Sequence, residues 1–533
     1  MSHFDIVVKN ARILDGSGSP AFKADLGIHY GKFTDIEPEL PADQAEMVVD
    51  GSHLVAAPGF IDVHSHDDLF LLRKPDADEK IQQGITTVLT GNCGFSAAPL
   101  LHNGKATLQT YDGVLGGGPA LDLFGDKISF DEYFDLLEES RPGINVGCLV
   151  GNVTLRLAVM GHAMRPPTAD ELTHMKGLVS EAMESGAFGL SSGLIYAPGS
   201  YAQPDELMEL ASVVAGYGGI YTTHMRNEGD KLLDSIHETI QLARECEMRA
   251  QISHIKASGR KNWGQSAEAL SVIRDAREDG LEITADQYPY NAGSTGLYAL
   301  LPPDTLSGGI DALAAQLRDS AYRKSLRDRI KNSHNQDSML AMGDFDRIHI
   351  SSSKLHPDFE GKSIEELADL LNRDPFDVVF DLVAEEKMQI TMITFGMDEG
   401  DIKRFMQADF VMMGTDGLPS FGSKVHPRMC GTAPRILGHY VREQHVLKLE
   451  EAIRKMTSLP AETFRLEGKG MIKEGYDADL VLFNPDEIID MATYENPTLP
   501  PLGIEHVIVN GVPAVEQGRV LGTRAGKVLR YTE

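Results

Sequence analysis

Two histidines separated by one residue form the first group in the chain that could do chemistry. His64 and His66 close the segment 58–66, which reads PGFIDVHSH. In a strand, residues two apart face the same side, so the two imidazoles would point together. Imidazole pairs bind zinc and similar metals. Taken alone, however, the pair is explained more simply as two hydrogen-bonded or solvent-exposed histidines.

Three further side chains that can bind metal stand at the ends of short apolar runs. They are His224, His254 and Asp416. Singly, each has an ordinary explanation, such as a helix cap for Asp416 or a hydrogen-bonded core histidine for the others. Together with the histidine pair they place polar metal-capable groups at the ends of four separate strands. That repetition favours a shared metal site over four unrelated structural roles.

The elements that must position these groups alternate along the chain. Apolar runs typical of strands are separated by stretches typical of helices, which predicts an α/β fold built as a (β/α)8 TIM barrel. Barrels place their chemistry at the carboxyl ends of the strands, where the polar residues fall. An open doubly wound sheet is the alternative, but no glycine-rich phosphate turn follows an early strand. The eight predicted strands are 60–63, 86–89, 146–150, 188–190, 220–223, 251–253, 281–285 and 410–413.

The two ends of the chain have a different sequence pattern from the middle. Both contain short strand-like runs with tight turns, such as Gly31-Lys32 and Asn510-Gly511,. Because chain ends often lie close together, we expect one small β-sandwich domain made from residues 1–56 and 467–533. The barrel would then occupy 57–466. The interval between the last two predicted strands, from 287 to 410, is too long for one helix. This predicts an insertion around 290–408 over the barrel mouth.

Composition and charge limit the possible partners. The 533 residues include 49 Lys plus Arg and 79 Asp plus Glu, giving a formal net charge of −30. This argues against nucleic acid and anionic membrane as partners, but not against a small anionic substrate. The four cysteines show no CxxC pairing, and no run of 18 apolar residues or basic signal segment occurs. We expect a cytoplasmic location, and the sequence leaves the oligomeric state open.

The pattern of ligands resembles the amidohydrolase superfamily over essentially the whole chain. Many members carry a bridging carbamylated lysine on the fourth strand, whereas segment 187–193 reads AFGLSSG and has none. That departure argues against the hydantoinase and dihydroorotase type. Cys93, at the end of the second strand, is the expected replacement because a thiolate is a strong, negatively charged zinc ligand. The alternative for Cys93 is a buried core thiol.

Several motifs are similar in combination to the N-acyl-D-amino-acid deacylases, or D-aminoacylases. They are GNCG at 91–94, HMRNEG at 224–229, HIK at 254–256, DQYPY at 286–290, GTDGLP at 414–419 and HPR at 426–428. The resemblance implies one tight Zn²⁺ and a second, weaker metal site. It implies that the tight zinc is held by Cys93, His224 and His254, and the weaker site by His64, His66 and Asp416.

The same resemblance implies roles for the remaining polar residues. Asp416 would move the catalytic proton, and the substrate α-carboxylate would be held by Lys256, Tyr288, Ser294 and Arg428. A lysine supplies a point charge and an arginine a planar fork for such a carboxylate. The side-chain pocket would include the apolar residues Ile195 and Met397, which favours neutral or hydrophobic substrates.

The expected reaction is zinc-dependent hydrolysis of the amide of an N-acyl-D-amino acid to a carboxylate and a free D-amino acid. The D-configuration follows from the resemblance alone. Two rival readings remain at this point. One is another amidohydrolase, either a dipeptidase or a cyclic-amide hydrolase. The other is a catalytically inactive metal-binding module, which the intact Asp416 and the complete ligand set disfavour.

Overall fold

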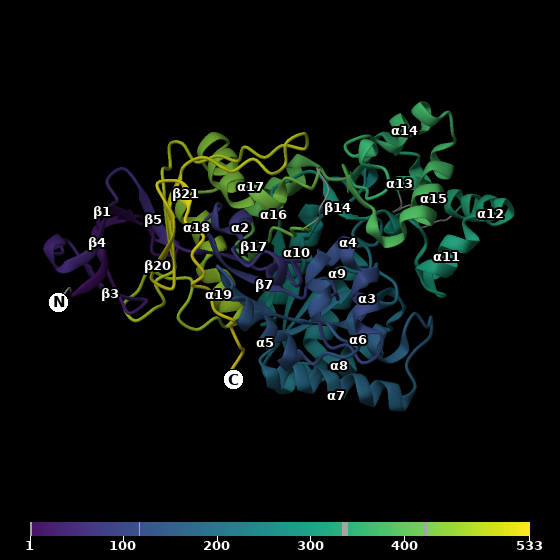
Figure 1. Cartoon of the computed structure of the whole chain (residues 1–533), viewed down its shortest axis with the longest axis horizontal. Coiled ribbons are helices and arrows are strands. Elements are labelled where there is room, and N and C mark those ends of the chain that lie inside the picture. The colour runs from purple at the N-terminus through teal and green to yellow at the C-terminus, as the bar shows by residue number, and fades with distance from the viewer. Residues whose placement is uncertain (1–2, 117, 333–338, 420–423, 533) are drawn as a thin grey trace.

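The computed structural model describes residues 3–116, 118–332, 339–419 and 424–532. Its two chain ends meet in one nine-stranded sheet, at the left of Figure 1, where purple and yellow strands lie together. The remaining elements form a barrel and, at the upper right of the view, a group of green helices. None of the described helices combines the length and apolarity needed to cross a bilayer.

Strand β5 joins the two halves of the terminal sheet. It pairs in parallel with β1 on one side and antiparallel with β18, from the other end of the chain, on the other. The expected sandwich is thus built as one continuous hydrogen-bonded sheet. The strands are β1 (Phe4–Ile13), β2 (Phe22–His29), β3 (Lys32–Glu37), β4 (Ala45–Asp50), β5 (Val55–Pro58), β18 (Leu480–Phe483), β19 (Ile504–Val509), β20 (Val512–Glu516) and β21 (Arg519–Val520).

Side chains along β18 alternate between two hydrophobic cores, one on each face of the sheet. Leu480 and Leu482 pack into a core of the terminal strands, whereas Val481 and Phe483 belong to the large core of the barrel. Successive strand residues face opposite sides, so a strand buried on both faces becomes continuously apolar. The sequence LVLF therefore follows from the position of β18 between two hydrophobic cores.

The middle of the chain forms the predicted (β/α)8 barrel. Within the described residues its strands run in parallel in the order of the sequence, with the third strand divided between β8 and β9. The strands are β6 (Phe60–Asp62), β7 (Ile85–Thr90), β8 (Asn145–Cys148), β9 (Val150–Gly151), β10 (Gly189–Gly193), β11 (Ile220–His224), β12 (Arg249–Ile252), β13 (Ile283–Gln287) and β17 (Val411–Met413).

The barrel closes between its first and last strands without a regular ladder. Asp416 N donates to His64 O at 2.8 Å, and His66 N donates to Gly417 O at 3.3 Å. An isolated parallel bridge between Ser65 and Gly417 completes the contact. We call this contact the closure seam. It lies at the carboxyl ends of β6 and β17, just beyond the strands themselves.

The helices between the strands have recognisable end signals. Thr168, for example, caps its helix in a reciprocal capping box with Glu171,. The barrel helices are α1 (Phe70–Arg73), α2 (Asp78–Ile81), α3 (Gly104–Thr110), α4 (Asp112–Leu115), α5 (Phe130–Ser140), α6 (Asn152–Met160), α7 (Ala169–Ser185), α8 (Pro204–Gly216), α9 (Leu232–Glu245), α10 (Ser266–Glu278), α16 (Glu399–Gln407), α17 (Arg428–Arg435), α18 (Leu449–Met456) and α19 (Ser458–Phe464).

The long segment between β13 and β17 has a fold of its own. A three-stranded antiparallel sheet in the order β14-β16-β15 supports helices that project at the upper right of Figure 1. The elements are β14 (Gly293–Gly296), α11 (Ile310–Gln316), α12 (Ser320–Lys331), α13 (Met339–Met342), β15 (Ile348–Ser352), α14 (Ile364–Leu371), α15 (Pro375–Glu386) and β16 (Thr391–Thr394).

Gly91 allows the chain to turn at the end of β7, two residues before Cys93. Its φ is +79°, and a Cβ at this position would lie 2.1 Å from the carbonyl oxygen of Leu149. An alanine there would combine left-handed strain with a backbone overlap that no rotamer change can relieve.

We expect Gly91→Ala to lower the melting temperature and the folded yield strongly. Gly475→Ala is the matched control, because Gly475 has a φ of +84° but nothing within 4 Å of its Cβ position. The control should lose only the strain energy, about 1–3 kcal/mol. Thermal melting by circular dichroism measures both, and equal losses would contradict the role of the overlap.

Candidate metal centre and active site

The six predicted ligands come together at the carboxyl ends of the barrel strands. The ligand atoms of Cys93, His224 and His254 lie within 4.8 Å of one another. The same limit holds for the group formed by His64, His66, Cys93 and Asp416. All six side chains are buried, and Cys93 belongs to both groups. The thiol is thus placed between the two groups, where many amidohydrolases have the carbamylated lysine that this chain lacks.

Individual contacts show how tight the cluster is. Cys93 Sγ lies 3.2 Å from His64 Nε2 and 3.4 Å from His254 Nε2. Asp416 Oδ1 lies 3.2 Å from His66 Nε2 and 3.6 Å from His64 Nε2. Five donor groups of the types that zinc prefers therefore converge on one small volume.

The backbone is strained at the three ligands that end strands β7, β12 and β17. Cys93, His254 and Asp416 have φ values of 53°, 35° and 48°. A residue with a Cβ pays about 1–3 kcal/mol to adopt this left-handed region, and such strain concentrates at functional sites. The sharp turn directs each side chain over the mouth of the barrel as its strand ends.

The ionisation of the cluster is governed by close opposite charges. Burial opposes the charged thiolate, but the neighbouring His64 and His254 hold the pKa of Cys93 well below its usual range. Burial likewise opposes the carboxylate of Asp416, and Arg428 and the imidazoles hold its pKa well below the ordinary value. His66 responds in the opposite sense: against the effect of burial, Asp416 and Cys93 raise its pKa to about 9.

His224 supplies a direct test of whether the residues fit a metal. Neither of its ring nitrogens has a hydrogen-bond partner among the described residues, although the side chain is buried. Leaving a buried polar atom unsatisfied costs free energy, and ligation of a metal by one nitrogen removes that cost. A thiolate beside imidazoles and a carboxylate is a donor set that suits zinc.

Two carboxylates that the sequence analysis left without a role orient the histidines. Asp286 lies 3.3 Å from His64 Nδ1 and accepts hydrogen bonds from the His254 backbone N and from Gln251. Glu228 lies 3.0 Å from His254 Nδ1. A carboxylate on the second ring nitrogen fixes the orientation of a ligating imidazole. Both carboxylates lie at or just after the end of a strand, as the candidate ligands do. That position was the only sequence signal by which they could have been found.

A cavity of about 170 Å³ opens beside the cluster. Lys256, Tyr288 and Ser294, predicted to bind a carboxylate, all line it, as do the predicted pocket residues Ile195 and Met397. The insertion also contributes apolar side chains that the sequence analysis did not name: Leu300, Met339 and Met392.

Arg428 lies next to these residues but faces Asp416. Its Nη1 is 2.8 Å from Asp416 Oδ2, and its guanidinium stacks 4.5 Å from the ring centroid of Tyr288. Its Nη2 donates to the backbone oxygen of Ser294 at 3.2 Å. The side chain is fully buried. In this structure the guanidinium therefore compensates the charge of Asp416, which sequence analysis did not foresee.

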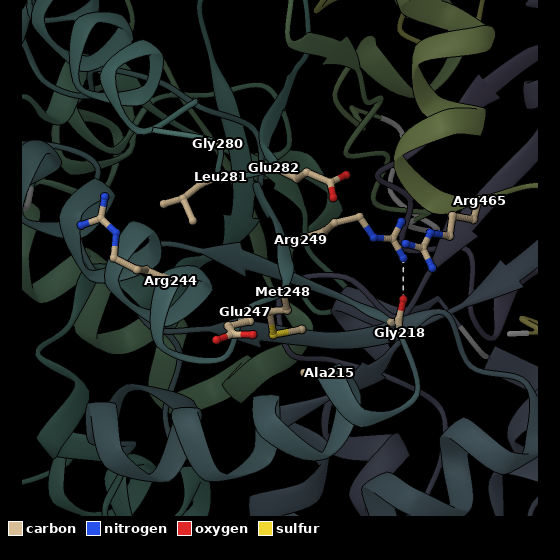
Figure 2. Close-up of a pocket in the computed structure, with 11 residues that line it drawn as sticks. Ala215, Gly218, Arg244, Glu247, Met248, Arg249, Gly280, Leu281, Glu282 and Arg465 are labelled. Atoms are coloured by element: carbon tan, nitrogen blue, oxygen red, sulfur yellow. Dashed lines mark hydrogen bonds between the residues drawn. The ribbon is translucent and has the colours of Figure 1, made fainter. Parts of the chain in front are cut away.

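Another hollow lies at the opposite, amino-terminal end of the barrel strands (Figure 2). Its arginines already have partners within the protein. Arg249 donates to the backbone oxygens of Thr463 and Gly218, Arg244 pairs with Asp279, and Arg465 donates to Tyr531. None of the predicted ligands lines it, so the chemistry belongs to the other end of the barrel.

Comparison with known proteins finds relatives that align with almost the whole chain. A family model described as "Amidohydrolase family" matches residues 310–515. D-aminoacylase of Alcaligenes xylosoxydans xylosoxydans is 38% identical over 99% of this chain and 98% of its own length. The chain belongs to the D-aminoacylase family of amidohydrolases. The resemblance read from the motifs is thereby confirmed.

Other members of the D-aminoacylase family differ in their substrates. N-acyl-D-glutamate deacylase of the same organism is 37% identical over 99% of this chain and 96% of its own length. A solved N-acyl-D-glutamate deacylase from Bordetella bronchiseptica, in complex with zinc and a phosphonate mimic of the tetrahedral intermediate, superposes with a TM-score of 0.83. That structure is 36% identical and covers 99% of both chains.

We predict that Cys93→Ala loses most of the tightly bound metal, because the thiolate belongs to both ligand groups. Zinc per protomer, measured by elemental analysis after dialysis, should fall well below that of the unchanged protein. Cys148→Ala is the control, since Cys148 is buried in β8 outside both groups. Retention of full zinc and activity by Cys93→Ala would remove the thiol from the site.

Proposed function

We propose that this protein is a zinc-dependent hydrolase of N-acyl-D-amino acids, releasing a carboxylate and a free D-amino acid. The observation that carries the proposal is the buried group of Cys93, His224 and His254, with Asp416 beside it, at the edge of a cavity that contains Lys256. The zinc-bound relative and the D-specific relatives support both the metal and the configuration of the substrate.

The metal ligands follow the assignment made from the motifs. Cys93, His224 and His254 would hold the tight zinc, and His64, His66 and Asp416 the weaker ion. Bound zinc would polarise the amide carbonyl and lower the pKa of water toward about 7. Asp286 and Glu228 would keep His64 and His254 in the orientations that ligation needs.

Asp416 is the group suited to move the proton. Its carboxylate lines the substrate cavity and lies next to the metal ligands. Held ionised by Arg428, it can accept a proton from the attacking water and return it to the leaving nitrogen,. Arg428 thus tunes the proton carrier in the substrate-free protein, and its fork would also be available to the substrate α-carboxylate in the complex.

Lys256 is the cation best placed for the α-carboxylate. Its Nζ is 2.6 Å from Glu228 Oε1 and 2.7 Å from His254 Nδ1, and its side chain lines the cavity. Tyr288 lies below it at 5.8 Å from ring centroid to Nζ. Ser294 completes the set from the insertion. A monoanionic substrate would then be oriented with its amide toward the cluster.

The remaining wall favours a neutral or hydrophobic side chain. Ile195, Met397 and the three apolar residues of the insertion line the cavity. An apolar wall cannot compensate a buried carboxylate, whose desolvation is costly unless it is paired. Arg347, a basic residue of the insertion, donates to Phe395 O and stacks on Trp263, and it does not line the cavity.

We also propose that the enzyme acts in the cytoplasm on this small-molecule substrate. The four cysteines are all free, and a catalytic thiolate ligand is best preserved in a reducing compartment,. The acidic surface disfavours nucleic acid and anionic membrane as partners.

Asp416→Asn should retain the fold while losing roughly 10²-fold or more in kcat on an N-acetyl-D-amino acid. The amide keeps the shape of the side chain but cannot carry the proton. The content of tight zinc should stay close to that of the unchanged protein, and the circular dichroism spectrum should remain that of a folded protein, although loss of the Arg428 partner lowers the melting temperature,. Turnover within a few-fold of the unchanged enzyme would exclude Asp416 as the proton carrier.

N-acetyl-D-leucine should exceed N-acetyl-D-glutamate in kcat/KM by at least about 10-fold. A difference of even one methylene in an apolar pocket is worth about 1–3 kcal/mol, and an unpaired buried charge costs more. The L-enantiomers serve as controls for configuration. A preference for the glutamate derivative would mean that a cation reaches the cavity, and turnover of L-substrates alone would overturn the assigned stereochemistry.

A further inference from the structure

A buried lysine lies under the closure seam of the barrel. Lys80, on the short helix α2, is 2% exposed. Its Nζ lies 2.7 Å from Asp62 Oδ2, 2.8 Å from Thr415 Oγ1 and 3.2 Å from Asp67 Oδ2. All three donor positions of the ammonium therefore have an oxygen partner. Burial alone would lower its pKa, but Asp62 and Asp67 raise it above the ordinary value, so the charge is kept.

Asp62 connects this lysine to the backbone on both sides of the seam. Its carboxylate accepts from His64 N at 3.2 Å, from Thr415 N at 2.8 Å and from Thr415 Oγ1 at 2.7 Å. His64 follows β6, and Thr415 follows β17. One ionised side chain thus ties together the ends of two strands that share no regular ladder.

Asp67 adds a second connection on the β6 side. It is paired with Lys80 and accepts a hydrogen bond from the hydroxyl of Ser65. Ser65 lies between His64 and His66 and bridges to Gly417 across the seam. Consequently, the segment with both histidines is held by two carboxylates, and Lys80 forms an ion pair with each of them.

The ligands of the two metal groups depend on this network to different degrees. His64, His66 and Asp416 all project from the two segments that the network ties together. His224 and His254 end β11 and follow β12, which pair through a continuous parallel ladder. The position of these two imidazoles is thus fixed by the sheet itself, without the seam.

We propose that Lys80 is a positioning residue that, through Asp62, Asp67 and Thr415, sets the geometry of the second metal group formed by His64, His66 and Asp416. It contacts neither substrate nor metal. The proposal rests on the metal role given to these residues under the proposed function. It makes the affinity of one metal site depend on a lysine outside both sites.

Lys80→Met tests the proposal, because it removes the ammonium while keeping most of the length of the side chain. Lys455→Met is the matched control. Lys455 is also buried, at 4% exposed, but its Nζ donates to the backbone oxygens of Ala408 and Val411, at the opposite end of β17 from the seam. Both variants lose a buried ammonium, and only one of them lies beneath the metal ligands.

The measurement is a titration of metal-free protein with Co²⁺, followed by absorbance. A thiolate–cobalt charge-transfer band reports binding next to Cys93, d–d bands report total binding, and the first and second equivalents separate the two sites by their affinities. We expect Lys80→Met to weaken the second equivalent by about 10–100-fold, the range for loss of a group that orients metal ligands. The first equivalent should change by less than about 3-fold, and Lys455→Met should leave both affinities within that limit even if its melting temperature falls.

Lys80→Arg keeps the test decisive if Lys80→Met does not fold. Arginine retains the charge but cannot place one nitrogen against all three oxygens, so the second equivalent should again weaken selectively. Unchanged second-site affinity in a folded Lys80 variant, or equal weakening of both sites, would overturn the proposal.

Cobalt binding and turnover of the unchanged protein distinguish failure of this proposal from failure of the proposed function. If it hydrolyses N-acetyl-D-leucine but binds only one cobalt, the positioning role fails and the deacylase function stands. If it neither binds cobalt nor turns over any N-acetyl amino acid, both fail.

Discussion

The attraction between buried opposite charges at the carboxyl end of the barrel is the interaction on which the rest of the structure depends. Cys93 and Asp416 are held ionised, and imidazoles, Arg428 and a bound metal are what can balance them. Removing one partner from such a buried group leaves an uncompensated charge, at a cost of about 3–5 kcal/mol. The surrounding carboxylates and Lys80 extend the same alternation of charge outward.

A rigid frame is needed to hold these groups against their own strain. Three ligands occupy left-handed backbone conformations, and their cost must be met by the packing of the strands that carry them,. The barrel supplies that packing through apolar strands that are buried on both sides. The irregular joint between β6 and β17 lies directly beneath three of the candidate ligands, and there polar side chains take over the role of a regular ladder.

Much of the fold and of the candidate site could be predicted from local pattern. Each barrel strand is a short apolar run, and five of the six candidate ligands stand at the ends of such runs, so the strands and these five residues could be predicted together. Cys93 was predicted only through the resemblance to the amidohydrolase superfamily. Glu228 and Asp286 were missed because a carboxylate near a strand end looks the same whether it faces solvent or an imidazole. The pairing of Arg428 with Asp416 depends on how α17 is placed against β17, and the apolar wall from Met339 and Met392 depends on how the insertion folds back. Neither has a signature in sequence spacing.

The joining of both chain ends in one sheet has a consequence for how the protein is made. Strand β5 leads directly into β6, the first barrel strand, yet its neighbour β18 is among the last elements to be synthesised. Until β18 arrives, the edge of β5 and the apolar face shared with the barrel stay uncovered. Pairing over such a long sequence separation is slow, and uncovered strand edges invite association with other chains. A chain truncated before β18 would therefore keep every candidate metal ligand, but the edge of β5 and the barrel residues that pack on Val481 and Phe483 would stay uncovered.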